Sequence, residues 1–444
     1  MKTNGSRNQL RAEDAPVHDW YRFVLSYPPH LVAEYLERFG VEPGEWVLDP
    51  FCGTGTTLVE CRKRGFSSIG TDAHPIPIFA SRVKTKWDLP VQELRDLLGR
   101  IVRSADEFLA GRGLPRLSLD SYLVSDGIVL YESSELQLSE EERQILPTGF
   151  ISPNPLTRLL ALRKCIERHT VSALTEIRHF FLLGLAHAAV NGAANIAFGP
   201  EIYRTKAKED YDVTGHFARQ VSGMIDDLDN IQKERAEYPP CAVIHDDART
   251  LAHVEDGISA VITSPPYPNE KDYTRTTRVE SILLGLIRSK QDLRAVKETL
   301  LRSNTRNVFV KDDDGKLVED IGSIQKICSA IEARRMELAK DSGFERLYHK
   351  VVAHYFGGMR RHFRSLFPKL RRGAKCAYVV GDQLSFLMIP IPTATLLAEI
   401  AEQEGYKVIG CDLWRERVGT KVRTSRTPLS SVRVQENVLL LGKT

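Results

Sequence analysis

The stretch Trp46-Val-Leu-Asp-Pro-Phe-Cys-Gly-Thr-Gly-Thr-Thr57 constrains the fold of this chain more than any other. Its first residues form an apolar run short enough for a buried strand, and two glycines then break that run. Residues 58–64 are predicted to form a helix, with Thr56 or Thr57 as its cap. Glycines let the backbone approach a ligand closely, and a helix N-terminus offers unpaired N–H groups. The stretch therefore predicts a nucleotide-sized cradle.

The loop of this cradle differs from both common phosphate-binding loops, because it has neither the G-x-x-x-x-G-K-[ST] nor the G-x-G-x-x-G pattern. Without that lysine, and with Asp49 before the turn, it suits a cationic ligand that lacks phosphate. Asp72 ends the next predicted strand, where a carboxylate can accept both ribose hydroxyls of an adenosine. The alternatives are an ordinary strand-to-helix turn, and an aspartate that caps the helix predicted over residues 75–84.

Ser264-Pro-Pro-Tyr267 is the second motif with chemical content, and it directly follows an apolar strand predicted over residues 258–263. A proline pair alone often marks only a loop. Its position at a strand end, in the same chain as the glycine loop, favours a functional role.

Together the two motifs resemble those of the S-adenosylmethionine-dependent amino-methylating DNA methyltransferases, D-P-F-x-G-x-G-T-T and [DNS]-P-P-[YFW]. The resemblance implies that S-adenosylmethionine is the cofactor and that the substrate is a base in double-stranded DNA. It also implies cofactor contacts from the glycine loop, from the segment before the helix predicted near residues 31–39, and from acids at strand ends. These candidates are Tyr27, Asp49, Pro50, Phe51, Gly53, Gly55, Thr56, Asp72, Asp246 and Asp247.

The chemistry of amine methylation explains the residue types in the Ser-Pro-Pro-Tyr motif. An exocyclic amine conjugated to a ring is a poor nucleophile and must become more tetrahedral to attack a sulfonium methyl group. The Ser264 hydroxyl and the Pro265 carbonyl can accept its two N–H groups and hold the nitrogen in line. Pro265 and Pro266 fix the backbone, and Tyr267 offers a stacking face to an extruded base. In the amino-methylating enzymes that this motif resembles, serine in the first position of the motif is associated with cytosine N4, and aspartate with adenine N6.

Residues after this motif are candidates for DNA contacts. Arg275 and Arg278 suit phosphate groups, and Tyr273 suits the gap that a flipped base leaves. The alternative is a helix start whose arginines pair with Glu280.

The C-terminal region adds a basic stretch between the last two predicted strands, with Arg417, Lys421 and Arg423 as candidate DNA contacts. The alternative is a solvated face. The acidic loop at residues 311–315 would repel DNA, so we expect it to face away from the substrate.

The order of the predicted elements indicates an α/β fold, a doubly wound Rossmann-like methyltransferase sheet interrupted by a mainly helical insertion. Residues 1–15 are polar and predicted to be disordered. Residues 16–90 and 240–444 are predicted to form the catalytic domain. Residues 91–239, strongly helical over 156–192, form the insertion, which is either a target-recognition region or a cap that only stabilises the core.

Composition excludes several other classes of protein. The net charge of +3 is small, so a polyanion must meet a local basic patch. No window approaches the 18 or more apolar residues of a membrane span, and the N-terminus is too polar for a signal peptide. The seven cysteines are scattered without a C-x-x-C pair. These features predict a cytoplasmic protein without a metal site.

The sequence thus favours methyl transfer to an exocyclic amine in DNA, with cytosine N4 ahead of adenine N6. Two further alternatives are an RNA guanine-N2 methyltransferase of related fold and a non-enzymatic nucleic-acid-binding module, which the intact motifs disfavour. A cognate restriction or defence partner follows from the resemblance alone, and the sequence carries no signal for the oligomeric state.

Overall fold

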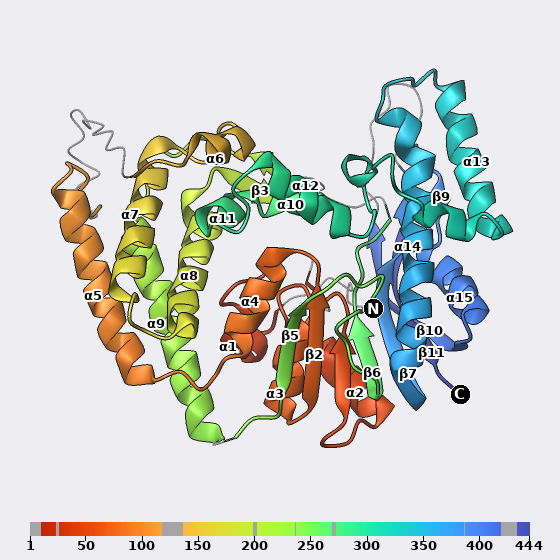
Figure 1. Cartoon of the computed structure of the whole chain (residues 1–444), viewed down its shortest axis with the longest axis horizontal. Coiled ribbons are helices and arrows are strands. Elements are labelled where there is room, and N and C mark those ends of the chain that lie inside the picture. Colours follow the sequence, from red (N-terminus) through yellow and green to blue (C-terminus); the bar gives the residue numbers. More distant parts are fainter. Residues whose placement is uncertain are drawn as a thin grey trace.

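The computed structural model describes residues 10–23, 26–117, 136–198, 202–235, 237–268, 272–385, 387–418 and 433–444. Within them the chain builds one large sheet with helices on both faces and a helical block beside it (Figure 1). The seven strands of this described sheet have the order β10-β11-β7-β6-β1-β2-β5. In chain order they are β1 (Trp46–Asp49), β2 (Ser67–Asp72), β5 (Cys241–His245), β6 (Ile258–Thr263), β7 (Leu370–Gly381), β10 (Lys407–Val418) and β11 (Arg433–Gly442).

The strand order reverses beside β1. This strand pairs in parallel with β2 on one side and with β6 on the other, whereas β11 is antiparallel to both β7 and β10. In a doubly wound sheet, ligands bind outside the carboxyl ends of the strands at such a reversal. The predicted doubly wound α/β fold is confirmed, and the reversal places the last residues of β1 and β6, Asp49 and Thr263, beside the expected crevice.

The core lies on both faces of the sheet because successive strand residues point to opposite faces. In β1, Val47 packs with α2 (Pro29–Phe39) on one face, and Leu48 packs with α14 (Tyr348–Lys369) on the other. All six residues of β6 are buried, as expected for a parallel strand covered on both sides. The covering layers also contain α3 (Thr56–Arg64), α4 (Pro75–Thr85) and α15 (Thr393–Gln403).

The helical block separates β2 and α4 from β5 in the chain (Figure 1), and its buried side chains form one hydrophobic cluster with residues of α3 and α4. The sequence indicated one helical stretch over residues 156–192. The structure has two helices there, because the chain turns at residues 170–174 and the second helix packs against the first. The elements of the block are α5 (Val91–Ala110), α6 (Glu140–Ile145), α7 (Pro153–His169), α8 (Thr175–Ala188), a π-helical turn (Ala189–Ala193), the hairpin strands β3 (Ile196–Phe198) and β4 (Ile202–Arg204), and α9 (Val213–Glu234).

The N-terminal segment is more ordered than the sequence indicated. Residues 1–9 lie outside the described part of the chain. Ala12–Asp14 forms a 3-10 turn and α1 spans Ala15–His18. The expected disorder up to residue 15 is therefore wrong for residues 12–15, because Val17 and His18 are buried in the core and fix the segment that precedes them.

A second insertion lies between β6 and α14. Its helices α10 (Tyr273–Thr276), α11 (Arg278–Leu283) and α12 (Lys290–Thr299) pass above the carboxyl ends of the strands in Figure 1. Its turn at Asp314–Val318 packs closely on α14, since a Cβ at Gly357 would lie 1.8 Å from the Asp314 carbonyl oxygen. The remaining elements are α13 (Gly322–Glu337), 3-10 turns at Thr305–Asn307 and Glu345–Leu347, and the short strands β8 (Gln383–Leu384) and β9 (Pro390–Ile391).

The acidic loop of this insertion, residues 311–315, is partly buried. Asp314 is 3% exposed and pairs with Arg249 at 2.9 Å and with Arg361 at 3.0 Å. Asp312 pairs with Arg302 at 2.6 Å. Arginines thus neutralise Asp312 and Asp314, whereas the side chain of Asp313 is 63% exposed. In the described part of the chain, no helix combines the length and the apolar character needed to span a membrane.

Candidate active site

A cavity of about 410 Å³ lies at the β1/β6 reversal, and three segments distant in sequence form a large part of its lining. The first wall is the glycine loop with the end of β2, and the second is the Ser-Pro-Pro-Tyr motif. The third wall, from the second insertion, was not predicted from the sequence. The residues that define these walls are Pro50, Phe51, Gly53, Thr56 and Asp72; Ser264, Pro265, Pro266 and Tyr267; and Thr299, Leu300, Leu301, Ser303 and Asn307.

The two glycines of the loop have different roles. Gly53 has φ +50°, and a Cβ there would meet only the Phe51 carbonyl oxygen, at 4.0 Å. Gly55 has φ +82°, and its Cβ would lie 2.9 Å from Ser81 Oγ, a group that donates to the Gly53 carbonyl. Gly55 therefore lets the loop pack on α4, and it is not among the described residues that line the cavity.

The start of α3 also differs from the prediction. Gly55 is the N-cap residue, and among the described residues no side chain caps the helix, so neither Thr56 nor Thr57 has that role. Thr57 instead donates to the Ile262 carbonyl at 3.0 Å. Because no side chain takes the first N–H groups of α3, they remain suited to a ligand in the cavity that Thr56 lines.

Asp49 lies behind the cavity wall and does not line it. Its carboxylate is fully buried and accepts hydrogen bonds from the Tyr27 and Thr263 hydroxyls, both at 2.6 Å, and from the Phe51 N–H at 3.2 Å. Burial raises the pKa of Asp49, and these hydrogen bonds oppose the rise. Asp49 thus holds Tyr27, which does line the cavity, rather than meeting a ligand directly.

Asp72 lies on the cavity wall, as an adenosine-binding carboxylate should. It accepts hydrogen bonds from the His74 N–H at 2.8 Å and the Gly53 N–H at 3.2 Å. Burial raises the pKa of Asp72 to about 7, against the effect of these bonds. It does not cap α4, because the His74 side chain does so by accepting from the Ile76 N–H.

The two acids after β5, Asp246 and Asp247, lie in different environments. Asp246 accepts from the N–H groups of Asp247 and His253, both at 2.8 Å, and is not among the cavity residues described. Asp247 lines the cavity, and its carboxylate is held by the guanidinium of Arg249 at 2.6 to 3.0 Å. Of the two predicted partners for an adenine amino group, only Asp247 is placed to reach one.

The hydroxyl of Ser264 is oriented as a hydrogen-bond acceptor toward the cavity. Ser264 Oγ donates its proton to the Val379 carbonyl at 3.0 Å, which leaves the oxygen lone pairs for a ligand N–H. The ring of Tyr267 is held by its hydroxyl, which donates to Glu436 at 2.9 Å, and Glu436 also pairs with Arg415. Glu436 and Arg415 line the cavity too, and no local motif marked them in the sequence.

The candidate DNA contacts near the Ser-Pro-Pro-Tyr motif lie in different environments. Tyr273 lines the cavity, and Arg275 is partly buried. Arg278 is only 7% exposed, and its guanidinium donates to the carbonyls of Thr274 and Ile145, both at 2.9 Å. Arg278 therefore anchors α11 to the helical block and is not free for a phosphate. Glu280 accepts a hydrogen bond from the Tyr21 hydroxyl, and no described contact pairs it with Arg275 or Arg278.

Three further candidates lie outside the described residues: Lys421 and Arg423 entirely, and Arg417 by its side chain. Among the residues that the structure describes, no three or more His, Cys, Asp or Glu side chains cluster in a way that could hold a metal ion.

Comparisons with known proteins agree with this geometry. The DNA methylase family model for N6 and N4 enzymes matches residues 7–76. The type II methyltransferase M.BsoBI of Geobacillus stearothermophilus is 24% identical over 91% of this chain and 81% of its own length. M.AvaI of Nostoc sp. is 20% identical over 88% and 80%, and M.MjaII of Methanocaldococcus jannaschii is 36% identical over 22% and 18%. With its doubly wound sheet and its two motifs at one cavity, the chain is similar to the amino-methylating DNA methyltransferases, which use S-adenosylmethionine as methyl donor.

Proposed function

We propose that this enzyme methylates the N4 amine of a cytosine extruded from double-stranded DNA. The observation that carries the proposal is the orientation of Ser264, whose hydroxyl proton is occupied by the Val379 carbonyl. An amine needs two acceptors while its lone pair turns toward the methyl group. Ser264 and Pro265 supply them at the wall of the cavity, and serine in this position favours cytosine over adenine.

The residues present fit S-adenosylmethionine, which supplies an electrophilic methyl group on a sulfonium sulfur when bound. Asp72 can accept the ribose hydroxyls, and the uncapped start of α3 with Gly53 gives a close approach to backbone N–H groups. Asp247 lines the same cavity, which supports a contact between its carboxylate and the adenine amino group. The loop lacks a phosphate-binding lysine, which agrees with a ligand that carries no phosphate.

The catalytic step needs no covalent bond to the protein. Bound S-adenosylmethionine would supply the methyl group to the lone pair of the base amine, and one amine proton would pass to water after the transfer. Ser264 and Pro265 hold the two N–H groups and stabilise the positive charge that develops on nitrogen. Tyr267, fixed by Glu436, stacks on the base.

The DNA-binding surface is also part of the proposal. The helical block at residues 91–239 would read the recognition sequence, and Arg417, Lys421 and Arg423 would contact the phosphate backbone. Replacing these three residues together should reduce DNA affinity and flatten its dependence on salt by about 0.9 for each phosphate group that the variant no longer neutralises. An unchanged salt slope would show that this stretch is only a solvated face.

Because several relatives are type II methyltransferases, we also propose a cognate nuclease in the cytoplasm.

Transfer of labelled methyl groups to unmethylated DNA, followed by nucleoside analysis, tests the proposal. N4-methylcytosine is expected. N6-methyladenine would retain the mechanism and overturn the choice of base. Methylation at C5 of cytosine, which requires a cysteine nucleophile, or transfer only to RNA, would contradict the mechanism or the substrate.

A further inference from the structure

The third wall of the cavity has the character of a binding surface for a heterocycle. It comes from the segment between α12 and the 3-10 turn Thr305–Asn307, and it combines the apolar Leu300 and Leu301 with the polar Ser303 and Asn307. It borders the same cavity as Ser264 and Tyr267. A flat ring with one polar edge would meet suitable partners on these walls.

Asn307 stands out in this wall. The residue is 1% exposed, yet neither Oδ1 nor Nδ2 has a hydrogen-bond partner among the residues that the structure describes. The neighbouring Asn304 differs, since its amide oxygen accepts from the Arg306 N–H and caps the turn. A buried amide without partners is costly to a folded protein, so its presence beside a ligand cavity points to a partner that binds there.

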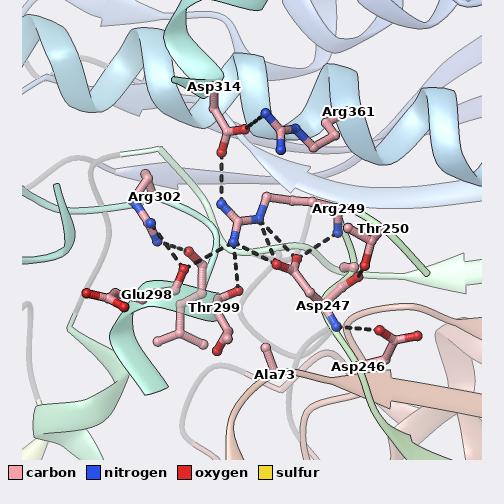
Figure 2. A network of polar contacts seen from close by, with 12 residues as sticks. Ala73, Asp246, Asp247, Arg249, Thr250, Glu298, Thr299, Arg302, Asp314 and Arg361 are labelled. Carbon is pink, nitrogen blue, oxygen red and sulfur yellow. Dashed lines mark hydrogen bonds and ion pairs between the residues drawn. The ribbon is translucent and has the colours of Figure 1, made fainter. Parts of the chain in front are cut away.

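The wall that carries Asn307 is held firmly. Arg302 pairs with Asp312 at 2.6 Å and donates to the Glu298 carbonyl at 3.1 Å. Arg249 donates to the carbonyls of Glu298 and Thr299, at 3.2 and 3.3 Å (Figure 2). Such support fixes the position of the amide before a ligand binds, which reduces the entropy lost on binding.

Arg249 extends this support to the cofactor side of the cavity. Figure 2 shows its guanidinium between Asp247, which follows β5, and Asp314 of the insertion. The base-facing wall and the predicted cofactor contact Asp247 are therefore joined through one largely buried side chain.

We propose that Asn307 recognises the target base by donating from Nδ2 to the ring nitrogen beside the reactive amine. This inference rests on the proposed function and adds the residue that selects the base. Ser264 and Pro265 take the two amine N–H groups, so the adjacent ring nitrogen, N3 of cytosine, still requires a donor. An amide N–H supplies it, as it does for base edges elsewhere. Adenine presents the same pair of groups through N1.

A double-mutant cycle between protein and DNA tests this pairing. After the methylated site has been mapped, a duplex with cytosine at the target is compared with one carrying 3-deazacytosine, which lacks the N3 acceptor. If mapping identifies adenine, 1-deazaadenine takes its place. For the wild-type enzyme we expect single-turnover efficiency to fall about 10- to 100-fold with the deaza base, and Asn307→Leu to cause a similar loss with the normal base. The deaza base should cause little further loss in the Asn307→Leu enzyme.

Two controls separate recognition from structure. Asn154 on α7 is also a buried amide whose oxygen lacks a described partner, but it does not line the cavity, so Asn154→Leu should leave the response to the deaza base intact. Asn307→Leu should keep cofactor affinity and should not lower the melting temperature, because it removes an unpaired polar group. If Asn307→Leu lowers the melting temperature and remains fully sensitive to the deaza base, the amide has only a structural role and the inference is overturned.

The two proposals fail in different ways. A wild-type enzyme that transfers no methyl groups to DNA would overturn the proposed function and this inference together. Methylation of DNA with no coupling between Asn307 and the ring nitrogen would overturn only the inference.

Discussion

Arg249 and Asp314 form an ion pair of 2.9 Å, although 65 residues separate them in the chain. Asp314 is 3% exposed and also contacts Arg361, and the other side of the Arg249 guanidinium holds Asp247. The pair thus fastens the second insertion to the loop after β5. It explains how a segment far from both sequence motifs becomes a wall of the cavity.

Asp314→Asn should therefore loosen the insertion. The change leaves Arg249 with Asp247 but removes a charged acceptor from a buried contact, so we expect the free energy of unfolding to fall by about 1–3 kcal/mol. The adjacent Asp313 is the matched control, because its side chain is 63% exposed and pairs with Arg361 at the surface. Asp313→Asn should change stability by less than about 0.5 kcal/mol. Urea denaturation compares the two, and equal losses would show that the buried pair contributes no more than a surface one.

The raised pKa of Asp72 predicts a pH dependence of cofactor affinity. Burial raises this pKa to about 7, and only the ionised carboxylate is a strong acceptor for ribose hydroxyls. Affinity for S-adenosylmethionine should therefore rise about tenfold between pH 6 and pH 8. Calorimetric titration measures it, and Asp72→Asn should bind more weakly at pH 8 and lose this part of the pH dependence. A variant with the same pH profile as the wild type would assign the dependence to another group.

The same shift has a consequence for the stability of the free protein. Because the folded-state pKa of Asp72 lies above the ordinary value of 3.8, the folded state holds a proton that the unfolded state has lost. The contribution of Asp72 to stability is thus present below about pH 4 and is lost as the pH rises through about 7. Burial also raises the pKa of Glu280 to about 7, so Asp72→Asn should remove only part of the slope of stability against pH.

The glycines of the cofactor loop should respond differently to alanine. Gly55→Ala places a Cβ 2.9 Å from Ser81 Oγ at φ +82°, so it should lower the melting temperature and weaken cofactor binding indirectly, by displacing the loop from α4. Gly53→Ala meets strain at φ +50° but no close neighbour, so its effect on stability should be smaller. Thermal denaturation with and without S-adenosylmethionine distinguishes them. Equal melting temperatures would refute the packing role of Gly55.

The parts of the site that the sequence could predict are those formed by neighbours in the chain. The strand, glycine turn and helix around Asp49 follow from local pattern, and the Ser-Pro-Pro-Tyr motif lies at a strand end for the same reason. The parallel strands on either side of β1 then bring the two motifs to one edge of the sheet. Local pattern together with the rules of doubly wound sheets was sufficient for this much.

The remainder depends on contacts between distant segments. Arg278 looks like a phosphate ligand in sequence, but a carbonyl 133 residues away takes its guanidinium. Asp49 looks like a cofactor ligand, but hydroxyls 22 residues before it and 214 residues after it occupy its carboxylate. The acidic loop looks exposed in sequence, but Arg249, Arg302 and Arg361 neutralise it. No periodicity or motif carries this information, because each pairing is decided by tertiary structure.

Ser264→Ala should separate chemistry from binding. It removes one of the two proposed acceptors for the base amine, while the Pro265 carbonyl and the Tyr267 ring, which Glu436 holds, stay in place. The methyl-transfer step should slow by roughly 30- to 1000-fold, or about 2–4 kcal/mol, with little change in affinity for cofactor or DNA. Ser264→Asp should be less harmful, because a carboxylate also accepts from an amine. Tyr267→Ala should lower both the methyl-transfer rate and the affinity for DNA with a mismatched target, because it removes the ring on which the extruded base stacks. Single-turnover transfer of labelled methyl groups compares the variants. If Ser264→Ala retains the wild-type rate, the serine hydroxyl does not hold the amine, and its bond to the Val379 carbonyl serves only the fold of the loop.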